Sequence, residues 1–104
     1  MLIELDIFSG RPNPRWPLSP PAARKLAELH HALPPSAHEP PDLPGLGYRG
    51  FVYELDGNIW RAWSGYVIGS HQALTDYGKV VETLLLSHLP VGHAGLRSRI
   101  RAEV

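Results

Sequence analysis

The residues best suited to chemistry lie together in residues 9–16, which read Ser-Gly-Arg-Pro-Asn-Pro-Arg-Trp. Arg11 and Arg15 can each clamp a carboxylate or a phosphate through two parallel hydrogen bonds, and the two prolines restrict the backbone. Asn13 precedes a proline, which predicts a turn in which the amide side chain bonds to its own backbone. A stiff loop with two charged heads and the indole of Trp16 is therefore our first candidate binding site.

The same residues also admit a structural interpretation. Arg11 would then pair with Asp6, and Trp16 would fold under the first helix and cap the core, so that the loop is a rigid connector. Asp6 and Glu4 share one face of a strand at a separation of about 7 Å, a spacing found between catalytic carboxylates. Asp6 is therefore a candidate for acid–base chemistry, although two acids on a wet strand face are typically just solvated.

A second candidate surface is the aromatic run that contains Trp60, Arg61 and Trp63. The two indoles have opposite parity, so a regular strand places one in the core and the other toward solvent. An exposed indole beside Arg61 can stack on a base, a sugar ring or a partner's side chain. The alternative is that these aromatics serve only to pack a small sheet.

The histidines provide the third set of candidates. No His-x-x-x-His spacing and no cysteine are present, so we predict no metal site and no cofactor. The alternative is a three-ligand site formed by His71, His88 and His93. His88 also falls within the apolar stripe of the second predicted helix, where it is either a satisfied core histidine or an acid–base candidate.

Length and composition limit the function classes. The chain has 104 residues, 43% of them hydrophobic, which predicts one domain spanning 1–104. Its formal net charge is zero, which argues against a nucleic-acid partner. It has no cysteine, no signal-like N-terminus and no apolar run near the ~20 residues of a membrane span. These features predict a soluble, cytoplasmic protein with no membrane association.

The helices and strands that must position these residues are predicted from hydrophobic periodicity and from the residues that typically begin or end such elements. Ser19 and Pro20 begin a helix that Pro34-Pro35 ends. Asp56-Gly57-Asn58 predicts a β-hairpin, with the choice between an Asp56-Gly57 and a Gly57-Asn58 turn left open. The expected elements are a strand at 3–8, the first helix with Ala22, Leu26, Leu29 and Leu33 as its apolar stripe, a Pro-rich loop at 34–46, strands at 48–55 and 59–68, a helix at 77–89 and a short helix after Gly95.

This order, β-α-β-β-α with a C-terminal helix, predicts an α+β fold with a largely antiparallel three-stranded sheet and helices on one face. We interpret Gly65 as a bulge or a bend within the third strand. Thr75 or Asp76 is expected to cap the second helix. The apolar stripe of that helix is wider than one sheet face needs, so the helix is either buried between elements or part of it meets another chain. Leu86 falls on the polar side of that helix.

Three functions remain open at this point. We favour a small binding or accessory module that contacts a protein or peptide partner through the Pro-rich loop and exposed aromatics, with a homo-oligomer as a further expectation. The first alternative is a small enzyme or small-ligand binder with a pocket between the Arg11–Trp16 loop and the central hairpin. The second is a nucleic-acid binder that uses residues 60–63 and the arginines of the C-terminal segment, Arg97, Arg99 and Arg101.

Overall fold

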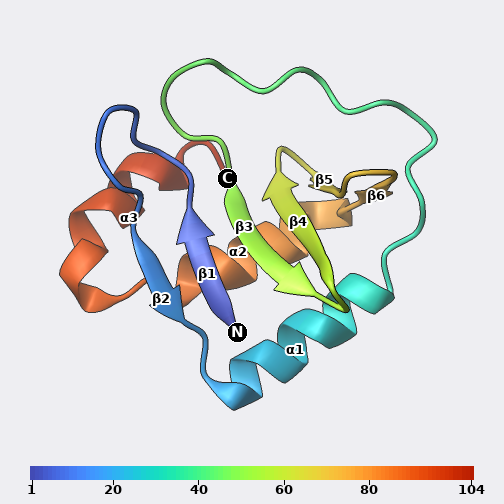
Figure 1. The fold of residues 1–104 in the computed structure, drawn as a ribbon, viewed down its shortest axis with the longest axis horizontal. Helices are drawn as coiled ribbons and strands as arrows, with labels where there is room; N and C mark the ends of the chain where they lie inside the picture. The colour runs from blue at the N-terminus through green and yellow to red at the C-terminus, as the bar shows by residue number, and fades with distance from the viewer.

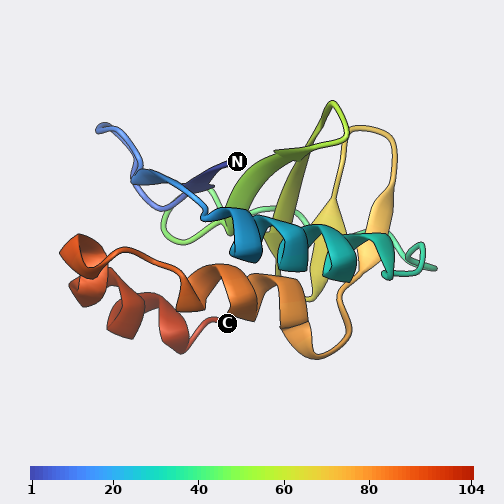
Figure 2. The same ribbon diagram turned by 90° about the horizontal axis from the view of Figure 1, so that it is seen from below.

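The computed structural model describes residues 1–104 as a six-stranded antiparallel sheet with its helices on one face (Figures 1 and 2). The strand order is β2-β1-β3-β4-β5-β6. The strands are β1 (Leu2–Leu5), β2 (Arg15–Pro17), β3 (Phe51–Leu55), β4 (Asn58–Trp63), β5 (Tyr66–Ile68) and β6 (Ala73–Thr75). The helices are α1 (Pro20–His31), α2 (Val80–Ser87) and α3 (Ala94–Arg101), with the short 3-10 turns η1 (Tyr77–Lys79) and η2 (Val91–His93).

The α+β class and the antiparallel sheet are confirmed, but the sheet has twice the predicted number of strands. One addition is β2, which lies in the stretch expected to be a connector and pairs with β1, so that Ile3 is opposite Trp16. On its other side β1 pairs with β3, with Ile3 opposite Tyr53. The N-terminal strand is therefore an interior strand of the sheet.

The predicted hairpin forms between β3 and β4, and its turn is Asp56-Gly57. Both turn residues have positive φ, 54° and 80°, as the two central positions of a type I′ turn require. The register places Val52 opposite Arg61 and Tyr53 opposite Trp60. The alternative Gly57-Asn58 turn is therefore wrong.

The predicted long strand at 59–68 is in fact two strands. Ser64 and Gly65 have φ of 54° and 87° and form a second two-residue turn, which sets Trp63 opposite Tyr66. Gly65 is thus a turn residue, and not the bulge that the sequence indicated. Aromatic and β-branched residues continue on both sides of the turn, so the composition alone shows no interruption.

The last strand, β6, was not predicted, and its outer edge is occupied by residues 34–36. Pro35 forms an isolated bridge with Leu74, the Ser36 N–H donates to the Ala73 carbonyl at 2.8 Å, and the Thr75 N–H donates to the Pro34 carbonyl at 2.9 Å. From there, residues 37–47 contain no helix or strand and arc around the rim of the sheet (Figure 1).

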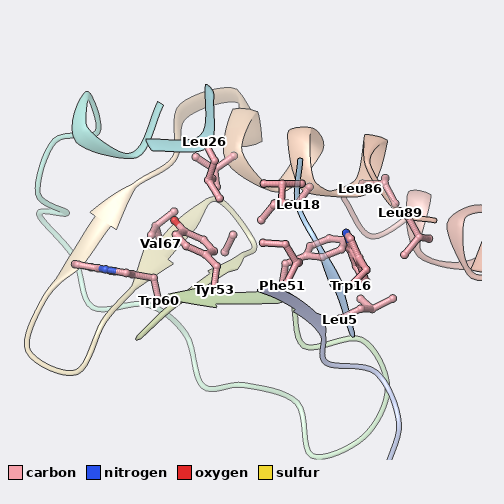
Figure 3. Close-up of a cluster of buried hydrophobic side chains, with 14 of the residues drawn as sticks. Leu5, Trp16, Leu18, Leu26, Phe51, Tyr53, Trp60, Val67, Leu86 and Leu89 are labelled. Atoms are coloured by element: carbon pink, nitrogen blue, oxygen red, sulfur yellow. The ribbon is translucent and has the colours of Figure 1, made fainter. Parts of the chain in front are cut away.

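The core lies between the sheet and the helices, and both Trp16 and Trp60 belong to it (Figure 3). Trp16 packs edge-on against Phe51 at 6.2 Å between ring centroids, and Trp60 packs against His30 at 4.6 Å. The part of the structural interpretation that places Trp16 in the core is thus confirmed.

The helix α1 begins at the predicted residue, but near its C-terminus the buried residue differs from the one predicted. The Ser19 hydroxyl accepts a hydrogen bond from the Ala22 N–H, which confirms the N-cap. The buried positions are Ala22, Leu26 and His30, whereas Leu29 is only partly buried. His30 continues the four-residue spacing of the stripe, so the apolar periodicity includes a polar residue.

The second helix differs more from its prediction. Asp76 is the N-cap of the 3-10 turn η1, and Lys79 stands at the N-cap of α2. The Asp76 carboxylate nevertheless accepts hydrogen bonds from the N–H groups of Val81 and Glu82 in the first turn of α2, at 3.2 and 3.3 Å. The helix nevertheless begins only at Val80, because Gly78 and Lys79 have positive φ and interrupt the pattern.

The buried face of α2 is also rotated relative to the prediction. Leu86, expected on the polar side, is buried, and His88, expected within the stripe, is exposed. Within the helix layer α2 packs against α1 and borders a hollow with α3, whose Ile100 is buried, so that α2 is covered from more than one side (Figure 2). None of the helices combines the length and the apolar character that a membrane crossing requires.

Candidate binding surface

The face of the sheet turned away from the helices, which we call the open face, carries a network of charged side chains. Asp6 extends from the end of β1 and pairs with Arg61 of β4 at 2.7 Å and with Arg49 at 3.6 Å. The Arg61 guanidinium also donates to the Arg49 carbonyl at 2.8 Å. The pair of Asp6 with Arg61 is a charge-assisted hydrogen bond, and it links the end of β1 to β4 across the intervening β3.

Asn13 organises the loop between β1 and β2. Its side-chain oxygen accepts hydrogen bonds from the backbone N–H groups of Ile7 and Phe8 at 3.0 and 2.8 Å. Its amide nitrogen donates to the Glu4 carboxylate at 3.1 Å and to the Asp6 carboxylate at 3.4 Å. The amide therefore bonds a backbone segment five and six residues upstream, and it joins that segment to both acids.

The two arginines of the loop do not act together. Arg15 contacts one carboxylate oxygen of Glu4 through two of its nitrogens, each at 2.9 Å. Arg11 lies over the ring of Phe8, with its guanidinium carbon 3.8 Å from the ring centroid. The expected pair between Arg11 and Asp6 is therefore wrong, because Arg61 and Arg49 occupy that carboxylate.

Beside this network the open face is hollowed and apolar. One hollow of about 410 Å³ lies between the β1–β2 side and the β3–β4 hairpin, and a second of about 430 Å³ lies between the hairpin and the Pro-rich segment. Val52 and Ile59 line both, so the two hollows form one surface, which we call the open-face groove. Its apolar lining comprises Met1, Leu2, Val52, Ile59, Ile68, Pro40, Pro41 and Leu43.

Two apolar residues of this groove are well exposed. Ile59 is 65% exposed and Leu2 is 56% exposed. The basic residues that border the groove, Arg15 and Arg61, are already paired with Glu4 and Asp6. Glu54 and Asp42 also line the groove and form no ion pair, so the groove carries two unpaired carboxylates.

The predicted aromatic site at Trp60, Arg61 and Trp63 does not form one surface, because its residues lie on opposite faces of the sheet. Trp60 points into the core, while Arg61 and the half-buried Trp63 belong to the opposite face. Because Trp60 is buried and Arg61 is held by Asp6, these two side chains do not form an exposed stacking surface. Gly69 packs tightly on the Trp60 ring, where an added Cβ would lie 2.8 Å from a ring carbon.

The three histidines proposed as metal ligands are not assembled into a site. His71 is in the β5–β6 loop, His88 follows the C-terminus of α2 and His93 ends η2. No group of three histidine, aspartate or glutamate side chains in the structure could hold a metal ion. His88 is exposed and makes no contact with Asp6, so the two acid–base candidates are not part of one site.

The sequence missed a set of buried polar residues beneath the sheet. The Tyr48 hydroxyl donates to the fully buried Glu82 carboxylate, whose second oxygen has no partner. Burial raises the pKa of Glu82, and the hydrogen bond from Tyr48 partly opposes that rise. Burial likewise raises the pKa of Asp76, and the hydrogen bonds that this carboxylate accepts from helix N–H groups partly oppose that rise. These acids are closed to solvent, so they affect stability and not ligand binding.

His30 and Tyr53 form a second buried polar pair. His30 Nδ1 lies 2.8 Å from the Tyr53 hydroxyl. Burial lowers the pKa of His30 and raises that of Tyr53, so both groups are neutral near pH 7. The spacing of His30 from Leu26 was the available signal for this pair. Glu82 gave no such signal beyond being the lone acid in an apolar helix.

No protein-family model, curated protein or solved structure matches this chain.

Proposed function

We propose that this chain is a small binding module that holds an extended segment of a protein partner in the open-face groove. The observation that carries the proposal is the exposed apolar strip from Leu2 through Val52 to Ile59, set between a fixed ion-pair network and the Pro-rich segment. Contiguous exposed apolar surface bordered by polar residues is typical of interaction sites.

The surroundings of the strip favour a preformed surface. Asn13 and the pair of Asp6 with Arg61 hold one side in place, so little side-chain order remains to be gained on binding. The prolines of residues 40–44 stiffen the opposite side. A rigid surface loses less conformational entropy when a partner binds.

The charge along the groove narrows the partner. Glu54 and Asp42 are unpaired, whereas Arg15 and Arg61 there are held in ion pairs with Glu4 and Asp6. We therefore propose a partner segment with apolar side chains for the groove and flanking lysine or arginine residues. A cytoplasmic location remains part of this proposal, on the ground that the chain has no cysteine.

The test uses a random peptide library displayed on phage and selected against the wild-type protein. Selected peptides are synthesised, and their affinity is measured for the wild type, Ile59→Asp and Val91→Asp. Val91 is 90% exposed and lies at η2, so it is a matched control for placing a charge on an exposed apolar residue.

We expect enriched peptides that combine apolar and basic residues, and we expect Ile59→Asp to weaken their binding by about tenfold or more. That factor corresponds to the ~1.5 kcal/mol or more lost when an apolar side chain is no longer buried. Val91→Asp should leave the affinity unchanged. If the selected peptides bind both variants equally well, the groove is not the site and the proposal fails.

A further inference from the structure

A second hollow lies on the helix side of the molecule, between α2 and α3. Its volume is about 440 Å³, and its lining comprises Thr83, Leu86, Ser87, Arg97, Arg101 and Val104. We call it the α2–α3 groove. The helices lie on one face of the sheet, so this groove is separate from the open-face groove (Figure 2).

The polar residues of the α2–α3 groove come in two rows. Thr83 and Ser87 are one turn apart on α2, and Arg97 and Arg101 are one turn apart on α3. Residues at this spacing lie on the same face of a helix. A row of two hydroxyls and a row of two guanidinium groups therefore line the same hollow.

Neither guanidinium in the groove is paired with an acidic side chain. Arg97 and Arg101 form no ion pair with an aspartate or a glutamate, and no aspartate or glutamate is part of the lining. Glu82, the one acid of α2, is buried in the core against Tyr48. The groove thus brings together two guanidinium groups with no carboxylate side chain among them.

Arg97 is also fixed in place. One terminal nitrogen donates to the Leu89 carbonyl at 2.7 Å, which anchors the guanidinium at the end of α2. Its Nε is buried and has no hydrogen-bond partner. Because this Nε is closed to solvent, the atom left for a ligand is the second terminal nitrogen, which makes no hydrogen bond within the protein.

The hydroxyls of the groove differ in what they can offer. Ser87 donates its hydroxyl hydrogen to the Leu84 carbonyl at 2.6 Å, as serines inside helices often do. No such bond engages Thr83, so its hydroxyl remains the free neutral donor of the groove.

We propose that the α2–α3 groove binds a small organic oxyanion, with a carboxylate or phosphate head on Arg101, Arg97 and Thr83. Guanidinium groups recognise both heads through paired hydrogen bonds. Leu86 and Val104 supply apolar surface for the body of the ligand. This site is independent of the proposed protein partner, since it shares no residue with the open-face groove.

The experiment is a set of NMR titrations of the 15N-labelled protein with phenyl phosphate, benzoate, inorganic phosphate and benzyl alcohol. We expect saturable shifts confined to residues 83–87 and 97–101. Either aromatic anion should bind more tightly than inorganic phosphate, and benzyl alcohol should give no saturable shift. The ratio of affinities for phenyl phosphate and benzoate assigns the head group to phosphate or to carboxylate.

Three variants test the residues. Arg101→Gln should lower the affinity for the tighter-binding aromatic anion by about tenfold, as expected for the loss of one charge-assisted contact. Arg99→Gln removes the same charge from an exposed position of α3 outside the lining, and should change the affinity less than about twofold in 0.15 M salt. Thr83→Val keeps the shape and the charge, and should weaken binding by about threefold through the lost hydroxyl.

Equal weakening by Arg101→Gln and Arg99→Gln would show general attraction to a basic helix, and would overturn the proposal. Shifts located elsewhere, or no saturation with either aromatic anion, would overturn it as well. Thermal unfolding of each variant checks that the fold is retained. If Arg101→Gln unfolds, an unchanged affinity of Thr83→Val for the tighter anion counts against the site.

Discussion

Replacing Tyr48 by phenylalanine should destabilise the protein by an amount that depends on pH. The hydroxyl that is lost is the one side-chain donor to the fully buried Glu82, whose second oxygen already lacks a partner. Burial and the neighbouring carboxylate raise the pKa of Tyr48 far above its usual range, so its hydroxyl remains a donor at every pH of interest.

The magnitude follows from the charge state of Glu82. A hydrogen bond to a charged group contributes about 1.5–3 kcal/mol, and one between neutral groups contributes about 1 kcal/mol. The hydroxyl stabilises ionised Glu82, so removing it raises the pKa of that carboxyl further above the value that burial alone sets. We expect a loss of about 1 kcal/mol at pH 4, where the carboxyl is protonated, and a loss that increases toward about 2–3 kcal/mol as the pH rises and the carboxyl ionises.

Linkage between folding and the ionisation of Glu82 sets the direction of this pH dependence. Because the pKa of Glu82 is raised in the folded state, its ionisation destabilises the fold as the pH rises above the ordinary value of 4.5. Below 4.5 the carboxyl is protonated in both states, and this contribution disappears. Tyr48→Phe steepens the loss above that value, so the difference from wild type must grow with pH.

The measurement is urea unfolding of wild type, Tyr48→Phe, Glu82→Gln and the double variant at pH 4 and pH 8. In the Glu82→Gln background no carboxylate remains, so the effect of Tyr48→Phe should be equal at the two pH values. If Tyr48→Phe has the same effect at both pH values in the wild-type background, the hydrogen bond does not act through an ionised Glu82 and the reasoning is wrong.

Three further predictions concern other parts of the fold. Burial lowers the pKa of His30, so the wild type should lose stability as the pH falls below the ordinary value of 6.5, and urea unfolding of His30→Gln should show a smaller loss over pH 7 to 5. Gly50→Ala should cost about 3 kcal/mol or more by thermal or urea unfolding, because φ is +95° and a Cβ would meet the Ala62 carbonyl and the Trp63 side chain. A cost below about 1 kcal/mol would contradict that steric argument. Asn13→Ala leaves the N–H groups of Ile7 and Phe8 without their acceptor, so we expect a loss of about 2 kcal/mol and faster amide hydrogen exchange at these two residues, whereas unchanged exchange would show that Asn13 does not hold the loop.

The sequence predicted the elements that carry strong punctuation or long periodicity. The N-cap at Ser19 and the β-hairpin at Asp56-Gly57 were recognised because their residue types are those that the local backbone demands. Strands β2 and β6 have three residues each, which is too short to show alternation. They form because a neighbouring strand offers free backbone groups, and that depends on the tertiary structure.

In the candidate sites, too, features set by the local sequence could be predicted, and features set by the tertiary structure could not. That the Asn13 side chain bonds the backbone could be predicted from its residue type, although it accepts from Ile7 and Phe8 and not from a turn of its own. The pair of Asp6 with Arg61 could not, because it depends on the strand order that places β3 between β1 and β4. The predicted face of α2 is wrong because Gly78 and Lys79, both with positive φ, separate Tyr77 from the helix, and because neighbouring elements cover α2 from more than one side. A pattern within one helix carries no information about which neighbours cover it.

The interior position of β1 has a consequence for the order of folding. The strands β3 to β6 follow one another along the chain with short turns, so their contacts are local and form at little entropic cost. Ile3, in contrast, pairs with Tyr53, and the whole of α1 and the Pro-rich loop lie between these two residues in the sequence. During synthesis the N-terminal strand therefore leaves the ribosome long before its partner exists. The meander of β3 to β6 is expected to form first and to act as the template on which β1, and then β2, completes the sheet.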